Sequence, residues 1–124
     1  MQAAQHTSTM YGSVMDDLVT RLESMLAKGQ DNTMLRLSLG KAYTEREQFD
    51  VAAPHLQAAL AFDPQYSVAW KWLGKALQGQ GDVAGARQAW EQGIAAAQTR
   101  GDQQIIKELQ VFLKRLDRAN QESR

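Results

Sequence analysis

Apolar residues recur every three or four positions along most of the chain, which is the spacing of one side of an α-helix. This pattern predicts six amphipathic helices, over residues 13–29, 33–46, 49–62, 67–78, 83–98 and 102–118. Between them lie turn and stop residues such as Gly29, Pro64 and Gly81. Because the connections are short, neighbouring helices are expected to be antiparallel, and the fold class is predicted to be all-α.

The two ends of the chain lack this periodicity. Residues 1–12 are polar and are expected to form a tail without regular structure, and residues 119–124 are expected to fray. Ser13 is expected to cap the first helix, since a serine side chain accepts a hydrogen bond from a free backbone N–H. Pro54 lies inside the third predicted helix, where its missing N–H favours an irregular start.

A four-residue segment, Leu-Gly-Lys-Ala, occurs at residues 39–42 and again at 73–76, 34 residues later. Ala52 and Ala86 have the same separation, and a large apolar residue, Leu56 or Trp90, follows each after four positions. Together with Pro64 at the end of the first unit, this pattern of spacings resembles that of the tetratricopeptide repeat family. The resemblance implies stacked helical hairpins, in one domain over residues 13–118.

Within that domain the resemblance assigns residues 33–64 to a first repeat and residues 67–98 to a second. Shifting the pattern back by 34 residues places Leu18, Leu22 and Met25 at the positions of Ala52, Leu56 and Ala59. The helix over residues 13–29 therefore resembles the second half of a degenerate repeat, and the helix over 102–118 resembles an unpaired first half. Since an array needs about three units to bury its core, both are expected to cover its ends.

The amino-acid composition excludes several classes of function. Fourteen basic and fourteen acidic residues cancel, so no overall field recruits nucleic acid or an anionic membrane. The chain has no cysteine, which excludes disulfides and zinc–thiolate sites and fits a reducing compartment. No apolar run reaches the roughly 18 residues of a membrane span. We expect a soluble, cytoplasmic protein.

No motif in the sequence predicts a catalytic or cofactor site. Residues 79–84 read G-x-G-x-x-A, but a dinucleotide site needs a strand before this fingerprint, and here a helix is predicted. His6 and His55, the two histidines, have no partner at ligand or triad spacing. We therefore expect neither an enzyme nor a bound metal or cofactor.

The family resemblance implies that the first helix of each repeat lines a concave groove that holds a protein or peptide. Counting about 100° per residue places Lys71, Lys75 and Gln78 on one stripe with Trp72 beside it. One repeat earlier, the stripe carries Leu37, Lys41 and Thr44, with Met34 and Val68 at its upper edge. Since cations and apolar side chains alternate there, an acidic peptide is the predicted ligand, its anion lying between Lys71 and Lys75.

The sequence leaves three alternatives open. The lysines can form an ordinary solvated face. Trp72 can pack against the neighbouring repeat or the last helix instead of anchoring a partner. The chain can also be a structural subunit that forms homo-oligomers through its terminal helices, in which case the groove is incidental. Nucleic acid is the least favoured partner, because acidic Glu108 and Asp117 interrupt the basic residues near the C-terminus.

Overall fold

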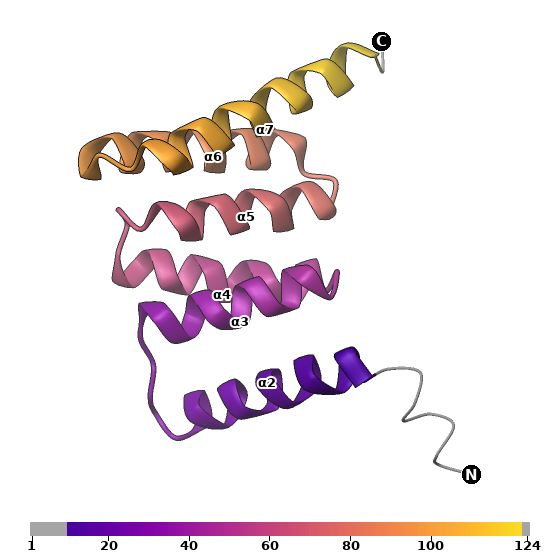
Figure 1. Cartoon of the computed structure of the whole chain (residues 1–124), viewed down its shortest axis with the longest axis vertical. Helices are drawn as coiled ribbons and strands as arrows, with labels where there is room; N and C mark the ends of the chain where they lie inside the picture. Colours follow the sequence, from indigo (N-terminus) through magenta and orange to yellow (C-terminus); the bar gives the residue numbers. More distant parts are fainter. Residues whose placement is uncertain (1–9, 123–124) are drawn as a thin grey trace.

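The computed structural model describes residues 10–122, and within them the chain forms helices and no strand. In order, these are α2 (Met10–Ala27), α3 (Thr33–Glu45), α4 (Phe49–Phe62), α5 (Ser67–Gly79), α6 (Val83–Arg100) and α7 (Gln103–Glu122). Figure 1 shows two antiparallel hairpins, α3–α4 and α5–α6, stacked between α2 at one end and α7 at the other. The all-α stack of six helices is thus confirmed for this part of the chain.

The helix ends differ from expectation mainly at the two termini. α2 begins at Met10, so Ser13 lies inside the helix and the predicted cap there is wrong. Gly12 costs about 1 kcal/mol of helix propensity but does not stop a helix. α7 continues to Glu122, because residues 119–122 contain neither glycine nor proline. The remainder of the expected tails, residues 1–9 and 123–124, lies outside the described residues.

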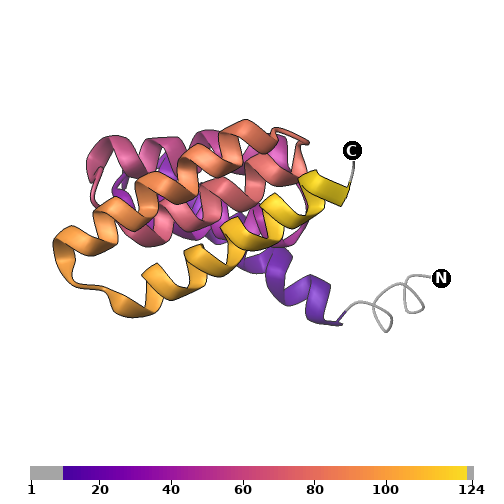
Figure 2. The ribbon, with the colours of Figure 1, turned by 90° about the horizontal axis from the view of Figure 1, so that it is seen from above.

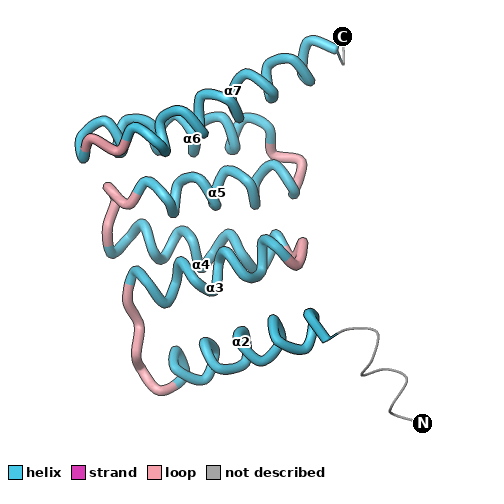
Figure 3. The backbone as a smooth tube through the Cα atoms, in the orientation of Figure 1, coloured by secondary structure: helices cyan, strands magenta, loops and turns pink. Residues whose placement is uncertain are grey.

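Inside the stack, local capping chemistry sets the boundaries. The Asn32 side chain accepts a hydrogen bond of 2.9 Å from the Leu35 N–H and starts α3, and Asp82 does the same for Gly85 at the start of α6. Gly101 ends α6 with φ +73°, a left-handed conformation that glycine adopts without steric cost. α4 is helical on both sides of Pro54. The short loops of Figure 3 follow from these stops.

Two glycines at the repeated Leu-Gly positions allow the helices of each hairpin to approach closely. A Cβ atom on Gly40 would lie 2.3 Å from Leu56 Cγ, and one on Gly74 would lie 2.1 Å from Trp90 Nε1. Leu56 and Trp90 are almost completely buried, with 0% and 2% exposure. Gly40 therefore permits close contact between α3 and α4, and Gly74 does the same in the second repeat with a larger partner.

α2 is attached to the stack largely through polar contacts. Val19 is its one buried hydrophobic residue among those whose side chains are described. Glu23 of α2 accepts a hydrogen bond from the Tyr43 hydroxyl and lies 3.9 Å from Nε2 of His55. The Tyr43 and His55 rings stack with centroids 5.6 Å apart. Burial, together with the Glu23 hydrogen bond, raises the pKa of Tyr43 to about 12.

Seen along the stack in Figure 2, α2 projects beyond the body formed by the other helices. Among the described residues, no helix combines the length and the apolar character needed to cross a membrane.

Candidate binding surface

Three lysines surround the side chain of Trp72 on one side of the stack. Nζ of Lys41, from α3, and Nζ of Lys71 each lie 5.7 Å from the Trp72 ring centroid, and Nζ of Lys75 lies 5.6 Å from it. These distances are within the range of about 6 Å for cation–π attraction. Trp72 is half-buried. We call Lys41, Lys71, Trp72 and Lys75 the Trp72 cluster; the structure brings these four predicted residues together.

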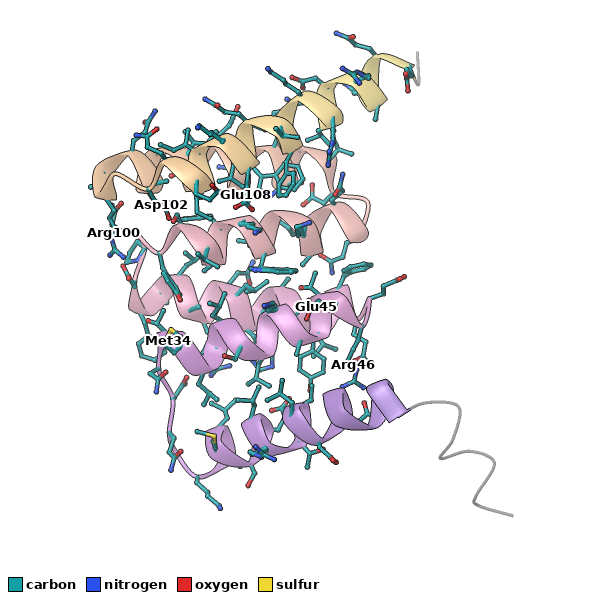
Figure 4. All side chains as sticks on the ribbon, viewed as in Figure 1. Met34, Glu45, Arg46, Arg100, Asp102 and Glu108 are labelled. Carbon is teal, nitrogen blue, oxygen red and sulfur yellow. The ribbon has the colours of Figure 1, made fainter. Side chains whose placement is uncertain are left out.

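Lys71 is already neutralised by the chain itself. Its Nζ lies 2.6 Å from Oε1 of Glu108, which extends from α7 toward α5 (Figure 4). The hydrogen bond from Lys71 lowers the pKa of Glu108. In this structure the last helix supplies a carboxylate partner for Lys71, and the predicted contact of Lys71 with a ligand stays a prediction.

Lys41 and Lys75 remain without a carboxylate partner in the part of the chain that the structure describes. Lys41 is exposed, whereas Lys75 is half-buried and also lies 4.5 Å over the Phe112 ring. Burial lowers the pKa of Lys75, and repulsion by Lys71 adds to this. An unpaired, partly desolvated ammonium group is stabilised by any anion that approaches it.

A small cavity of about 110 Å³ opens beside Lys75, between α5 and α7. Gln78, which is exposed, contributes to its lining together with Phe112 and Arg115. Arg115 was not singled out by the sequence pattern of α3 and α5, because it comes from the terminal helix. The cavity extends the cationic surface of the Trp72 cluster toward α7.

The other residues predicted to line the groove have mixed positions. Leu37 is 8% exposed, since α3 turns it into the core shared with α4 and α5. Thr44 is 7% exposed, and its hydroxyl donates a 2.7 Å hydrogen bond to the Gly40 carbonyl. Both side chains are therefore largely buried in this structure, and their place in a groove stays a prediction. Val68 is half-buried, and Met34 is 61% exposed, its sulfur accepting from the Tyr66 hydroxyl at 3.2 Å.

A second hollow lies on the opposite side of α5. This cavity of about 650 Å³ lies between α4 and α6, and Trp70, Leu73 and Leu77 of α5 also line it. Its walls carry the glutamines Gln57, Gln88 and Gln92. No sequence pattern predicted this cavity, because it arises from the angle between two helices that are not neighbours in the chain.

The described residues contain no group of three histidine, aspartate or glutamate side chains placed to hold a metal ion. His55 lies 3.0 Å from Arg36 through Nδ1, and Arg36 also pairs with Asp31 at 2.8 Å. Burial lowers the pKa of His55. This histidine therefore belongs to the polar contacts between α2, α3 and α4.

Comparison with known proteins places the fold. A model of the tetratricopeptide repeat matches residues 43–109. The TPR repeat-containing protein PA0015 of Pseudomonas aeruginosa is 57% identical over 102 residues, which cover 82% of this chain and 97% of that protein. The heat-shock protein cognate co-chaperone sgt12 of Aspergillus fumigatus is 34% identical over 79 residues, which make up 64% of this chain and 23% of that protein.

Two solved structures agree with this placement. The solution structure of protein BPP2914 from Bordetella parapertussis is 72% identical, with a TM-score of 0.74 over 82% of this chain and 89% of that one. The crystal structure of the Sgt2 TPR domain from Aspergillus fumigatus is 26% identical, with a TM-score of 0.75 over 97% of this chain and 77% of that one. The chain belongs to the tetratricopeptide repeat family, whose domains are protein-interaction modules.

Proposed function

We propose that this chain is a non-catalytic adaptor, similar in role to a co-chaperone, which binds an acidic peptide segment of a partner protein at the Trp72 cluster. The observation that carries the proposal is the pair Lys41 and Lys75, both placed around a half-buried tryptophan and neither paired with a carboxylate in the described chain. One of the relatives is a co-chaperone by name, which supports a role in handling other proteins.

The geometry favours an extended segment with two acidic residues on one side. Nζ of Lys41 and Nζ of Lys75 both lie within 5.7 Å of the Trp72 ring centroid, so their separation is at most twice that distance. In an extended peptide, side chains at positions i and i+2 point the same way and are about 7 Å apart. Two carboxylates with this spacing can approach both ammonium groups while their methylene stems contact the indole.

The internal pair of Lys71 and Glu108 has a structural role in this proposal. At 2.6 Å it joins α7 to α5 and removes one positive charge from the centre of the surface. This leaves the two remaining ammonium groups, from α3 and from the next turn of α5, to set the charge that a ligand must carry. The proposed ligand preference is thus for two negative charges on one side of the segment.

Fluorescence anisotropy with labelled peptides tests the proposal. An extended peptide with glutamates at i and i+2 should bind, and its glutamine counterpart should bind at least about tenfold more weakly, because each charge-assisted hydrogen bond contributes about 1.5–3 kcal/mol. The Lys41→Ala, Lys75→Ala double variant should lose this preference. Lys114→Ala, which removes an exposed lysine of α7, is the matched control and should keep it.

Salt and the tryptophan supply two further readouts. Raising the ionic strength should weaken the acidic peptide, since exposed charges are screened over about 10 Å at 0.1 M salt. Trp72→Ala should weaken both the acidic peptide and its neutral counterpart, because the apolar contact does not depend on charge. Unchanged binding in the double lysine variant would remove the assignment of the Trp72 cluster as the binding site.

A further inference from the structure

The cavity of about 110 Å³ beside Lys75 is built from one turn of α5 and one turn of α7. α5 contributes Lys75 and Gln78, and α7 contributes Phe112 and Arg115. The members of each pair are three positions apart, so they leave the same side of their helix. Trp90 of α6, which is buried, also lines the cavity, and its ring centroid lies 5.3 Å from that of Phe112. The cavity thus combines aromatic walls with polar and charged groups from two helices.

The polar side chains of this cavity have no polar partner in the part of the chain that the structure describes. Lys75, Gln78 and Arg115 form no side-chain hydrogen bond and no ion pair there. Their ammonium, amide and guanidinium groups are all hydrogen-bond donors. The cavity therefore presents three donor groups whose hydrogen bonds a ligand with several acceptor oxygens can complete.

The charge around the cavity is positive. Within the described residues, the charges that act on Lys75 are those of Lys71, Glu108 and Arg115. Glu108 is the one acidic group among them, and its carboxylate is bound to Lys71 at 2.6 Å. Asp117, the next acidic residue of α7, is bound in an ion pair with α6. Two positive charges, on Lys75 and Arg115, are thus left unbalanced, and partial burial of Lys75 limits their screening by water.

We propose that this cavity binds a phosphoryl group on a serine or threonine of the partner segment, with Lys75 and Arg115 holding its oxygens from two helices. This assigns one of the two negative charges of the bound segment, and so it rests on the proposed function. A phosphate monoester carries a charge of about −1.5 to −2 at pH 7 and three acceptor oxygens. These match the two cations and the three donor groups. The planar guanidinium of Arg115 can bind two phosphate oxygens at once.

Size and charge favour a phosphoryl group over other anions. A carboxylate has one charge and two oxygens, so it leaves one cation and one donor group of the cavity without a partner. At about 110 Å³, the cavity is smaller than the roughly 300–1,000 Å³ of pockets that enclose whole small molecules. It therefore suits a single charged group at the end of a side chain.

Lys75 connects this cavity to the Trp72 cluster. Its Nζ lies 5.6 Å from the Trp72 ring centroid and 4.5 Å from the Phe112 ring centroid. A segment that crosses Trp72 can therefore place its phosphoryl group on the Phe112 side of Lys75, while a carboxylate of the same segment meets Lys41. The partner segment then carries one acidic residue and one phosphorylated residue.

Fluorescence anisotropy with labelled peptides of otherwise identical sequence tests the inference. One peptide carries glutamates at i and i+2, and two others carry phosphoserine in place of either glutamate. The better phosphopeptide should bind at least about tenfold more tightly than the diglutamate peptide. Arg115→Ala should remove this gain and change the affinity of the diglutamate peptide by less than about threefold. Arg21→Ala, the matched control, removes an exposed arginine from α2 at the other end of the stack and should change neither affinity.

The possible results distinguish the phosphoryl site from the function on which it rests. If the diglutamate peptide binds and phosphoserine brings no gain, or if the gain survives Arg115→Ala, the phosphoryl site is overturned and the acidic-peptide site stands. If neither the diglutamate peptide nor a phosphopeptide binds, both are overturned. Circular dichroism of each variant shows that the helices remain formed.

Inorganic phosphate, added as a competitor, tests the source of the phosphoryl group. It should displace the phosphopeptide only at millimolar concentrations, because it lacks the contacts of the segment with Trp72 and Lys41. Displacement at the dissociation constant of the phosphopeptide itself would identify the free ion as the ligand and overturn the assignment to a partner segment.

Discussion

Replacing Gly74 by alanine is expected to destabilise the protein, although alanine is the better helix former. A Cβ at position 74 would lie 2.1 Å from Trp90 Nε1 and 2.5 Å from Cδ1 of the same ring. Trp90 is 2% exposed and is held by a 3.1 Å hydrogen bond from its Nε1 to the Lys71 carbonyl. The indole must move to admit the methyl group, and this movement breaks the hydrogen bond.

The magnitude follows from three opposing terms. Helix propensity favours alanine by about 1 kcal/mol. Displacing a well-packed buried ring costs about 1–3 kcal/mol, and leaving its N–H without an acceptor costs about 1–3 kcal/mol more. Gly74→Ala should therefore lower the free energy of unfolding by about 3 kcal/mol. Gly40→Ala meets Leu56 at 2.3 Å but breaks no hydrogen bond, so its net effect should be about 1 kcal/mol.

Urea denaturation followed by circular dichroism measures the free energy of unfolding of both variants. In thermal unfolding, a loss of about 3 kcal/mol should lower the Tm of Gly74→Ala by more than about 10 °C. Trp90→Phe provides the second edge of a double-mutant cycle, because phenylalanine lacks the clashing N–H. In that background Gly74→Ala should cost at least about 1.5 kcal/mol less. A Gly74→Ala variant that is more stable than the wild type would refute the reasoning, since propensity alone would then decide the outcome.

Three further predictions concern ionisable groups. Because burial holds the pKa of His55 below its usual 6.5, the unfolded chain binds the proton more tightly, and stability should fall as pH drops below about 6.5; His55→Gln should abolish this in urea titrations between pH 7 and 5. The pairing with Lys71 lowers the pKa of Glu108, so its contribution to the free energy of unfolding is present at neutral pH and is lost as pH falls through the folded-state pKa. Glu108→Gln should lower the free energy of unfolding by about 1 kcal/mol at pH 7 and should weaken its dependence on pH under acidic conditions. An unchanged pH profile would contradict the pairing with Lys71. Spectrophotometric titration should find one tyrosine that ionises near pH 12, and Glu23→Gln should return Tyr43 toward 10, while an unshifted phenol in the wild type would show that α2 does not hold it.

The surface around Trp72 shows which features of a surface can be predicted from the sequence and which cannot. Residue spacing placed Lys41, Lys71, Trp72 and Lys75 on one side, because side-chain direction along a helix is fixed by its 3.6-residue turn. The same counting did not separate Leu37 and Thr44 from the surface, since their burial depends on how far α3 is rotated toward α5. Helix rotation is a property of packing between elements.

The role of Glu108 is a second feature that the sequence alone did not predict. In the sequence it appears as an acidic interruption in a basic stretch, and in the structure its carboxylate neutralises Lys71, 37 positions earlier in the chain. The exposed apolar residues of α2, Leu18 and Met25, are a similar case. The 34-residue register identified Leu18, Leu22 and Met25 as repeat positions, but only the tertiary structure showed that no helix covers them.

The sequence by itself determined the repeat and the helices from Thr33 to Arg100, to within about two residues. Caps, stop residues and helical periodicity act over one or two turns, so they can be read without knowing the fold. The tertiary structure decided which lysines keep a free charge, which stripe residues are buried, and that one end of the stack is left apolar. Those outcomes depend on the angles and rotations with which distant helices pack, and packing is fixed by all the side chains of a contact together.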